Sequence, residues 1–281
     1  MGRYGGRWSG FAATAMSRGM SKAVKIRVAI IAAMEREVKP LIRNWQVRTI
    51  EHDGRPYRLF ENGEAALICG GIGAEAARHA TEAVIQDVGP EQVVSVGFAG
   101  ALDGSLKVGQ VVEPSIVINA ADGARTEVGS GAGTLVSTKA VADKDQKSRL
   151  AKAYGATAVD MEAAAVAQGA QARGVGFGAI KAISDAADFS LPSMDRFVAA
   201  DGTFQSVRFA CHAALRPWLW GSTMALARNS ARASQALCEA LAEYLARESS
   251  TNTGAKRGLS DESLVAGMNQ NKVAVPTLER K

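Results

Sequence analysis

The sequence predicts an α/β fold, a mainly parallel sheet flanked by helices. Short apolar runs, which indicate strands buried on both faces, alternate with stretches of helical periodicity. The three clearest runs are residues 26–33, 93–97 and 176–183, and each is followed by a polar or glycine-rich segment. Alternation of this kind is typical of a single α/β domain in which helices cover the sheet.

The remaining expected elements follow from local signals such as turn residues and apolar stripes. Asn62-Gly63 predicts a hairpin turn, Pro114 predicts a kink inside a strand, and residues 115–137 are too rich in Gly and Ala to assign. The expected helices are 34–45, a helix from the glycines at 70–73 to 88, 143–154 (exposed), 161–173, 204–215 and 218–247; the expected further strands are 57–61, 64–69, 108–119 and 157–159.

Composition divides the chain into three parts. Residues 1–25 form a basic extension and residues 249–281 a polar tail, both expected to be disordered, and residues 26–248 form one folded domain;. Six of the 33 basic residues and no acidic residue precede Val28, so the rest of the chain has 27 basic against 28 acidic residues. The net charge of +5 therefore belongs to the extension, and a nucleic-acid groove, which needs clustered positive charge, is not expected.

Other function classes find little support in the composition. Three cysteines and three histidines are scattered without the spacing of a metal site or a disulfide framework;. No run reaches the about 18 to 20 apolar residues of a membrane span, and the N-terminal stretch lacks the apolar core of a secretory signal. We expect a soluble, cytoplasmic protein with no metal and no cofactor, since a dinucleotide fingerprint is missing too.

Acidic side chains follow several of the predicted strands. Glu37 follows the first strand, Asp160 and Glu162 follow the short strand at 157–159, and Asp185 follows the last. Ligands bind such sheets beyond the carboxyl ends of the strands, and carboxyl groups in different environments can serve as acid, base and ligand for hydroxyl groups. Each residue also has a structural interpretation, as a first-turn helix acid or a cap.

Three separated motifs, in this order, carry a resemblance to a known family. They are VAIIAAMEREV at 28–38, VGFAGALDGSLKVGQVV at 96–112, and AVDMEAAAVA with AIKAISDAAD within 158–188. The chain resembles the nucleoside phosphorylase family (purine and uridine phosphorylase type), and within it the methylthioadenosine/S-adenosylhomocysteine nucleosidases. The resemblance implies a single domain around a mixed, partly closed sheet, cleavage of the N-glycosidic bond of a purine nucleoside, and a homodimer.

The resemblance also implies roles for individual residues. Glu37 matches the acid that activates the attacking water, and Asp185 matches the acid that assists protonation of the purine N7. Met161 and Glu162 match a pair that packs on the ribose and hydrogen-bonds its hydroxyl groups, and Met34 matches a residue beside the sugar. Without the resemblance, the two methionines are equally well explained as core residues.

The chain departs from the family pattern at several positions. Phe98 stands where the nucleosidases have Ser. Phe98 and Ser184 are both still expected to contact the substrate, because they lie in the matching segments. Gly70 replaces another Ser, Lys181 replaces an Arg, and Ser95 occupies the position of an Arg that related phosphorylases use for phosphate. Because phosphate sites rely on bidentate, charge-assisted contacts, we expect hydrolysis rather than phosphorolysis.

Two alternatives stay open at this point. Gly70, Gly71 and Gly73 could form an anion nest at a helix start, with Lys181 nearby, or simply a tight strand-to-helix turn. The departures also leave room for a catalytically inactive, nucleoside-binding member of the family.

The substrate is expected to be a 5′-modified adenosine. Residues 134–150 resemble the hopanoid-associated members of the family, which act on adenosylhopane, so a methylthio, homocysteine or hopane-type group is expected at the 5′ carbon. Four aromatic residues could line an apolar pocket for that group or could form the packing face of a helix. They are Phe204, Phe209, Trp218 and Trp220.

Overall fold

The computed structural model describes residues 25–129, 131–189 and 220–268, together with the single positions 197, 199, 202 and 205. Strands and helices alternate along most of this length, as the sequence predicts. The strands are β1 (Val28–Ala32), β2 (Gln46–His52), β3 (Arg55–Asn62), β4 (Ala65–Cys69), β5 (Gln92–Ala101), β6 (Val111–Val112), β7 (Ile116–Asn119), β8 (Arg125–Glu127), β9 (Thr134–Ser137), β10 (Ala158–Asp160) and β11 (Gly176–Asp185). The helices are α1 (Glu35–Ile42), α2 (Ala74–Val88), α3 (Lys144–Tyr154), α4 (Ala163–Gln171) and α6 (Trp220–Met268).

The described strands form one mixed sheet that branches at β5. The order is β2-β3-β4-β1-β5-β10-β9-β7-β8, with β11 paired to β5 and β6. The start of β5 pairs in parallel with β1, its end pairs antiparallel with β10, and β11 runs parallel along its other edge. The α/β fold and the mixed sheet are therefore confirmed, and β1, β5 and β11 all end on the same side.

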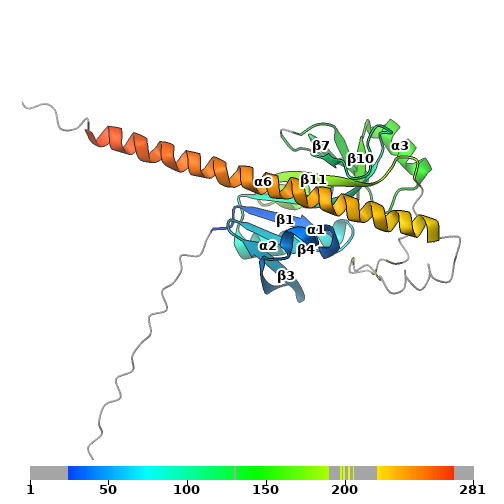
Figure 1. Cartoon of the computed structure of the whole chain (residues 1–281), viewed down its shortest axis with the longest axis horizontal. Helices are drawn as coiled ribbons and strands as arrows, with labels where there is room; N and C mark the ends of the chain where they lie inside the picture. The colour runs from blue at the N-terminus through cyan, green and yellow to red at the C-terminus, as the bar shows by residue number, and fades with distance from the viewer. Residues whose placement is uncertain are drawn as a thin grey trace, which may run out of the picture.

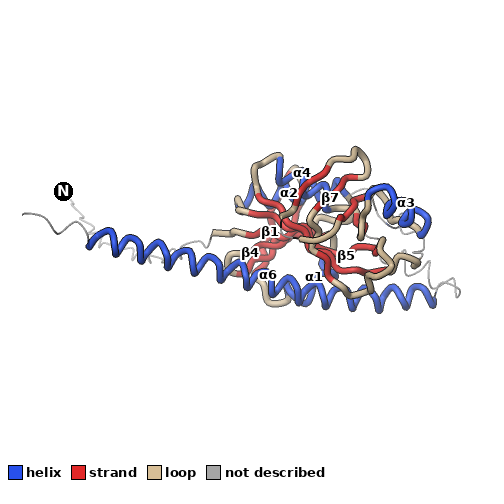
Figure 2. The backbone as a smooth tube through the Cα atoms, turned by 90° about the horizontal axis from the view of Figure 1, so that it is seen from above, coloured by secondary structure: helices blue, strands red, loops and turns tan. Residues whose placement is uncertain are grey.

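Helices cover both faces of this sheet, and β1 shows how. Ala29 and Ile31 pack with apolar residues of α2 and α4, whereas Val28, Ile30 and Ala32 pack with apolar residues of α1 and α6. Because both faces are buried, the strand is apolar throughout instead of alternating. Figures 1 and 2 show α6 lying along the domain, with its C-terminal part extending beyond the sheet.

The structure corrects several expected elements. Strand β2 was not predicted; it pairs with β3 through the Asp53-Gly54 turn. The expected strand 108–119 is two strands, β6 and β7, with different partners, and the unassigned region contains β8 and β9. The hairpin β3–β4 is confirmed.

At the C-terminal end, helix α6 extends past Ser249 to Met268. The disordered tail that the composition predicts from residue 249 stays a prediction. The expected helix 204–215 lies outside the described residues, apart from Gln205, and so do the side chains of Phe204, Phe209, Trp218 and Trp220. Within the described part of the chain, no helix is long and apolar enough to cross a membrane.

Candidate active site

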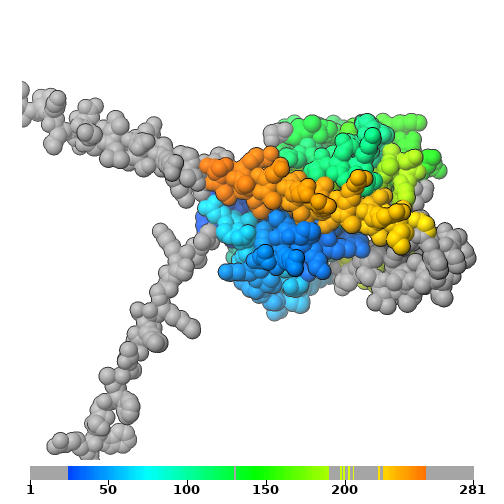
Figure 3. All heavy atoms as spheres, in the orientation of Figure 1, coloured from blue at the N-terminus to red at the C-terminus, as the bar shows by residue number. Residues whose placement is uncertain are grey.

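A cavity of about 960 Å³ opens where β1, β5, β10 and β11 end. The prediction that polar strand ends converge at one edge of the sheet is confirmed, because residues from all four ends line this cavity. All seven residues that were predicted as catalytic or nucleoside-binding belong to the wall: Met34, Glu37, Phe98, Met161, Glu162, Ser184 and Asp185. The face of the molecule that carries α6, whose residues complete the wall, is drawn in Figure 3.

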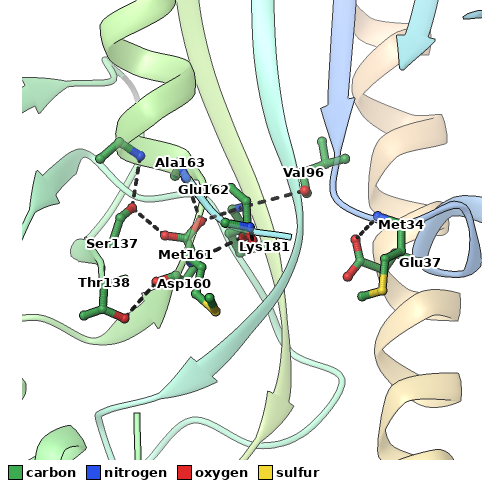
Figure 4. Close-up of polar contacts among 12 residues, drawn as sticks. Met34, Glu37, Val96, Ser137, Thr138, Asp160, Met161, Glu162, Ala163 and Lys181 are labelled. Atoms are coloured by element: carbon green, nitrogen blue, oxygen red, sulfur yellow. Dashed lines mark hydrogen bonds and ion pairs between the residues drawn. The ribbon is translucent and has the colours of Figure 1, made fainter. Parts of the chain in front are cut away.

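Glu37 lies in the first turn of α1, directly after β1. Its carboxylate is buried, and its Oε2 accepts a hydrogen bond of 3.3 Å from the Met34 amide (Figure 4). Burial, and then the negative charge of Glu162, raise the pKa of Glu37 to about 7;. Gly97 permits this approach, since a Cβ atom there would lie 3.0 Å from Oε2. A carboxyl group with this pKa can exchange protons near neutrality, as a general base must.

Helix α6 fixes the backbone beneath Glu37. The Ser234 hydroxyl lies 2.9 Å from the Glu37 carbonyl oxygen and 3.3 Å from the Arg36 carbonyl oxygen. Pro40 has no N–H, so it cannot provide the intrahelical hydrogen bond that the Arg36 carbonyl would otherwise accept. The Ser234 hydroxyl compensates for that missing donor and joins α1 to α6.

Glu162 lies at the junction of β10 and α4. Its Oε1 accepts a hydrogen bond of 2.8 Å from the Gly73 amide, and its Oε2 accepts one of 3.3 Å from the Met161 amide. Burial, and then the charge of Asp160, raise the pKa of Glu162;. A carboxylate on the cavity wall can accept hydrogen bonds from two neighbouring hydroxyl groups of a ligand.

The predicted anion site is not supported by this geometry. The Gly70 amide donates to the carbonyl oxygen of the last residue of β1, the Gly71 amide donates to that of the residue after it, and the Gly73 amide donates to Glu162. Lys181 is paired with an aspartate, and none of the four residues lines the cavity formed by the described residues. The glycines form a tight strand-to-helix turn, and the anion held at the start of α2 is the protein's own Glu162.

Lys181 forms an ion pair of 2.8 Å with Asp160, and both side chains are fully buried. Burial alone would lower the pKa of Lys181, but Asp160, Glu162 and Glu37 together raise it;. Asp160 also accepts a hydrogen bond of 2.5 Å from the Ser137 hydroxyl and one of 2.9 Å from the first amide of α4 (Figure 4). Asp160 therefore binds the first amide of α4 although Glu162 is the N-cap residue of that helix, and the Lys181 cation lies behind the cavity wall.

Asp185 ends β11 and has a different set of partners. Its Oδ1 accepts a hydrogen bond of 2.7 Å from the Ser184 hydroxyl, and its Oδ2 forms a buried ion pair with Lys147 of α3. Gly100 leaves room for this pair, because a Cβ atom there would lie 2.9 Å from Oδ2 and 3.2 Å from Lys147 Cε. Both members of the pair line the cavity.

Lys147 is the functional candidate that the sequence reasoning missed. The helix at 143–154 was expected to be exposed, yet Lys147 is only 2% exposed. A signal was present: Lys147, Leu150, Ala151 and Tyr154 have the spacing of one helix face, and the last three pack into the core;. A lysine on an apolar stripe indicates a buried partner. Ser234 carried no such signal, because nothing local shows which helix its hydroxyl faces.

Two departures from the family pattern have physical reasons. At Gly70 a Cβ atom would lie 2.6 Å from Ala80 Cβ and 2.8 Å from the Ala76 carbonyl oxygen, so α2 packs too closely for a serine. Ser95 is completely buried, its hydroxyl has no partner among the described residues, and it lies off the cavity wall that they form. It therefore contributes no phosphate contact to the cavity.

One group among the described residues could hold a metal ion, and it lies away from the cavity. It consists of His52, Asp53 and Glu82. Glu82 already pairs with Arg78 at 3.0 Å, which reduces its capacity to bind a cation.

The fold and the cavity define the class of the protein. An α/β domain with buried carboxylates of unlike environment at its strand ends is built for acid–base chemistry on a small ligand. The chain belongs to the phosphorylase superfamily, whose model matches residues 27–144 and 130–213.

Individual relatives agree with this assignment. The chain is 30% identical to a 5′-methylthioadenosine/S-adenosylhomocysteine nucleosidase of Actinobacillus succinogenes, over 58% of this chain and 87% of the relative. Among solved structures, a nucleosidase of the same name from Helicobacter pylori matches with a TM-score of 0.61 at 19% identity, over 79% and 99% of the two chains. A futalosine hydrolase from Helicobacter pylori matches with a TM-score of 0.60 at 19% identity, over 79% and 98%. The two structural matches support the fold.

Proposed function

We propose that this protein hydrolyses the N-glycosidic bond of a 5′-modified adenosine and releases adenine. The observation that carries the proposal is the joint position of Glu37, Glu162 and Asp185 on one cavity. Glycosidic cleavage develops positive charge on the ribose and negative charge on the leaving base, so it needs groups that act on the nucleophile, the sugar and the base. Three carboxyl groups in three environments match these three needs.

The roles follow from the surroundings of each residue. Glu37, with its pKa near neutrality, takes a proton from the attacking water;. Glu162 accepts hydrogen bonds from the ribose hydroxyl groups, while Met34 and Met161 pack against the sugar. Asp185 assists protonation of the purine N7, with the Ser184 hydroxyl bonded to it, and Phe98 gives the cavity an apolar wall.

The size of the cavity supports a substrate larger than a plain nucleoside. Its volume of about 960 Å³ lies near the upper end of the range for drug-sized ligands;. Residues of α6 extend the wall beyond Glu37 with small and apolar side chains: Leu226, Ala227, Ser230 and Ala231. We assign this part to the 5′ substituent. The names of the relatives favour a methylthio or homocysteine group, and the resemblance of residues 134–150 to hopanoid-associated members is the ground for a hopane-type group.

Water is the proposed nucleophile. The amides of the glycine turn and Lys181 are bonded within the protein and do not line the cavity, so the residues that the family pattern offers for an anion do not face a phosphate there. The resemblance also favours a homodimer, which sedimentation analysis of the purified chain tests directly.

The test is adenine release from three nucleosides, each assayed with and without phosphate. The substrates are 5′-methylthioadenosine, S-adenosylhomocysteine and adenosine, and the Glu37→Gln variant is the inactive control. We expect adenine from at least one 5′-modified substrate without phosphate. Release only with phosphate would replace hydrolysis by phosphorolysis, and nucleoside binding without release would favour the inactive, binding member of the family.

A further inference from the structure

The hydrogen bonds of Asp185 raise a question about the source of the proton. Its Oδ1 accepts from the Ser184 hydroxyl and its Oδ2 accepts from the Lys147 ammonium. A carboxylate whose two oxygens both accept has no proton of its own to give. If the leaving purine is protonated on this side of the cavity, the proton must come from a group that donates to Asp185.

Lys147 is the stronger of the two donors. Its ammonium bonds to Asp185, to the Ala186 carbonyl oxygen at 2.8 Å and, more weakly, to the Phe189 carbonyl oxygen at 3.4 Å. It is buried, it lines the cavity, and β5 leaves room for it through Gly100. An ammonium gives up a proton far more readily than a hydroxyl group does.

A role in packing alone explains Lys147 poorly. It lies on the apolar stripe of α3, where a buried ion pair is often no more stabilising than apolar side chains of similar volume;. A buried cation that lines a cavity and is bonded to a carboxylate on the same wall has instead the position of a proton source.

We propose that Lys147 supplies the proton that reaches the purine N7 through Asp185; this inference rests on the proposed function. As the C1′–N9 bond breaks, its electron pair passes into the purine, Nζ gives a proton to Asp185 Oδ2, and the carboxyl proton passes to N7. Water oxygen bonds to C1′ while Glu37 takes one water proton. Lys147 is left as a neutral amine and recovers its proton from solvent, to which Glu37 returns one.

The test compares two leaving groups in Lys147 variants of the full chain. 5′-Methylthioadenosine needs a proton on its base, whereas p-nitrophenyl 5-methylthioriboside leaves as a stable anion. We expect Lys147→Met to lower kcat on the adenosine substrate by about 10²-fold or more and to change kcat on the nitrophenyl substrate by less than about tenfold. An equal loss on both substrates would overturn the proposal, since that is the effect of a structural defect.

Lys147→Arg gives a second, independent readout. Arginine can keep the charge and the pair with Asp185 but does not release a proton. We expect Lys147→Arg to lose adenine release on the adenosine substrate as Lys147→Met does, and to keep most of its rate on the nitrophenyl substrate. A wild-type rate in Lys147→Arg would overturn the proposal even if the nitrophenyl substrate is not accepted.

Controls separate this inference from the proposed function. Lys152→Met removes an exposed lysine from the same helix and is expected to leave both rates unchanged. Thermal unfolding and adenine binding show whether each variant is folded. If the wild type releases no adenine from any nucleoside, the proposed function fails; if it does and the Lys147 variants match it, only the proton source is wrong.

Discussion

Glu37 and Asp185 both line the cavity, but the protein surrounds them differently. Glu37 is bonded by one amide and lies near a second carboxylate, and burial raises its pKa to about 7. Asp185 accepts a hydrogen bond from the Ser184 hydroxyl and forms an ion pair with the Lys147 ammonium. Two carboxyl groups in such unlike environments can serve different roles in one reaction, one as the base and the other in protonation of the leaving group.

The positions of two buried lysines create this difference. Lys181 is bonded to Asp160 behind the wall and acts on Glu37 only through its field, whereas Lys147 is on the wall and touches Asp185. A Lys–Asp pair therefore lies off the cavity in one place and on the cavity wall in the other. Substitutions of residues around Glu37 and of the buried lysines test this difference between Glu37 and Asp185.

The largest effect is expected from Glu37→Gln. Glutamine keeps the shape but cannot take a proton from water, so adenine release should fall by about 10²–10⁴-fold in kcat. Glu35→Gln, on the same helix but at the surface beside Arg58, is the matched control and should retain the wild-type rate. A Glu37→Gln variant that keeps more than about a tenth of the wild-type kcat would remove Glu37 from its role as base.

Lys181→Met should act mainly on stability. It leaves Asp160 buried without its cation, which is expected to lower the free energy of unfolding by about 3–5 kcal/mol. Urea unfolding of this variant and of Lys181→Met/Asp160→Asn measures the effect, and the double variant should recover part of the loss. A loss below about 1 kcal/mol would mean that the pair does not support the fold.

Much of the site was predictable because its residues follow strands. The runs that form β1, β5 and β11 are apolar and continuous, so the residues after them had to meet at one edge of the sheet. The order of apolar runs and acidic residues is therefore enough to bring Glu37 and Asp185 to the same edge. The motif resemblance added the mixed sheet, which periodicity alone does not reveal.

What remained hidden depends on contacts between distant segments. The pair of Lys147 with Asp185 joins α3 to β11, and no local pattern specifies which buried acid a lysine on an apolar stripe will meet. Strand β2 was missed for a related reason, since it is an edge strand with mostly exposed side chains and lacks a continuous apolar run;. The sequence could not show what the glycine turn binds, because the carboxylate that accepts from the Gly73 amide belongs to Glu162, which lies in a distant segment.

The raised pKa of Glu37 predicts two pH effects of intermediate size. Protonation below about pH 7 removes the base, so kcat/KM should fall by about tenfold for each further pH unit;. For stability, the folded protein holds a proton between pH 4.5 and about 7 that the unfolded chain has released, so the free energy of unfolding falls as the pH rises through this window;.

The Glu37→Gln variant measures the loss of stability that ionisation of the buried Glu37 causes. At pH 8 the variant should be more stable than the wild type by up to about 3 kcal/mol, and near pH 4 the difference should disappear. Chemical unfolding at the two pH values measures it, with Glu35→Gln again as the control. A gain that is the same at both pH values would show that ionisation of Glu37 is not its cause.

The smallest effect is expected from Ser234→Ala on α6. The substitution removes the hydroxyl group from the Glu37 and Arg36 carbonyl oxygens, and because Pro40 gives Arg36 no replacement donor, the start of α1 should loosen;. The free energy of unfolding should fall by about 1 kcal/mol. Adenine release should fall several-fold in kcat with little change in KM, since Glu37 is displaced while the ribose and purine contacts are kept. Ser250→Ala removes an exposed hydroxyl group from the same helix away from the cavity and is the control; it should retain the wild-type stability and rate. If the two variants behave alike, the Ser234 hydroxyl does not hold Glu37 in position.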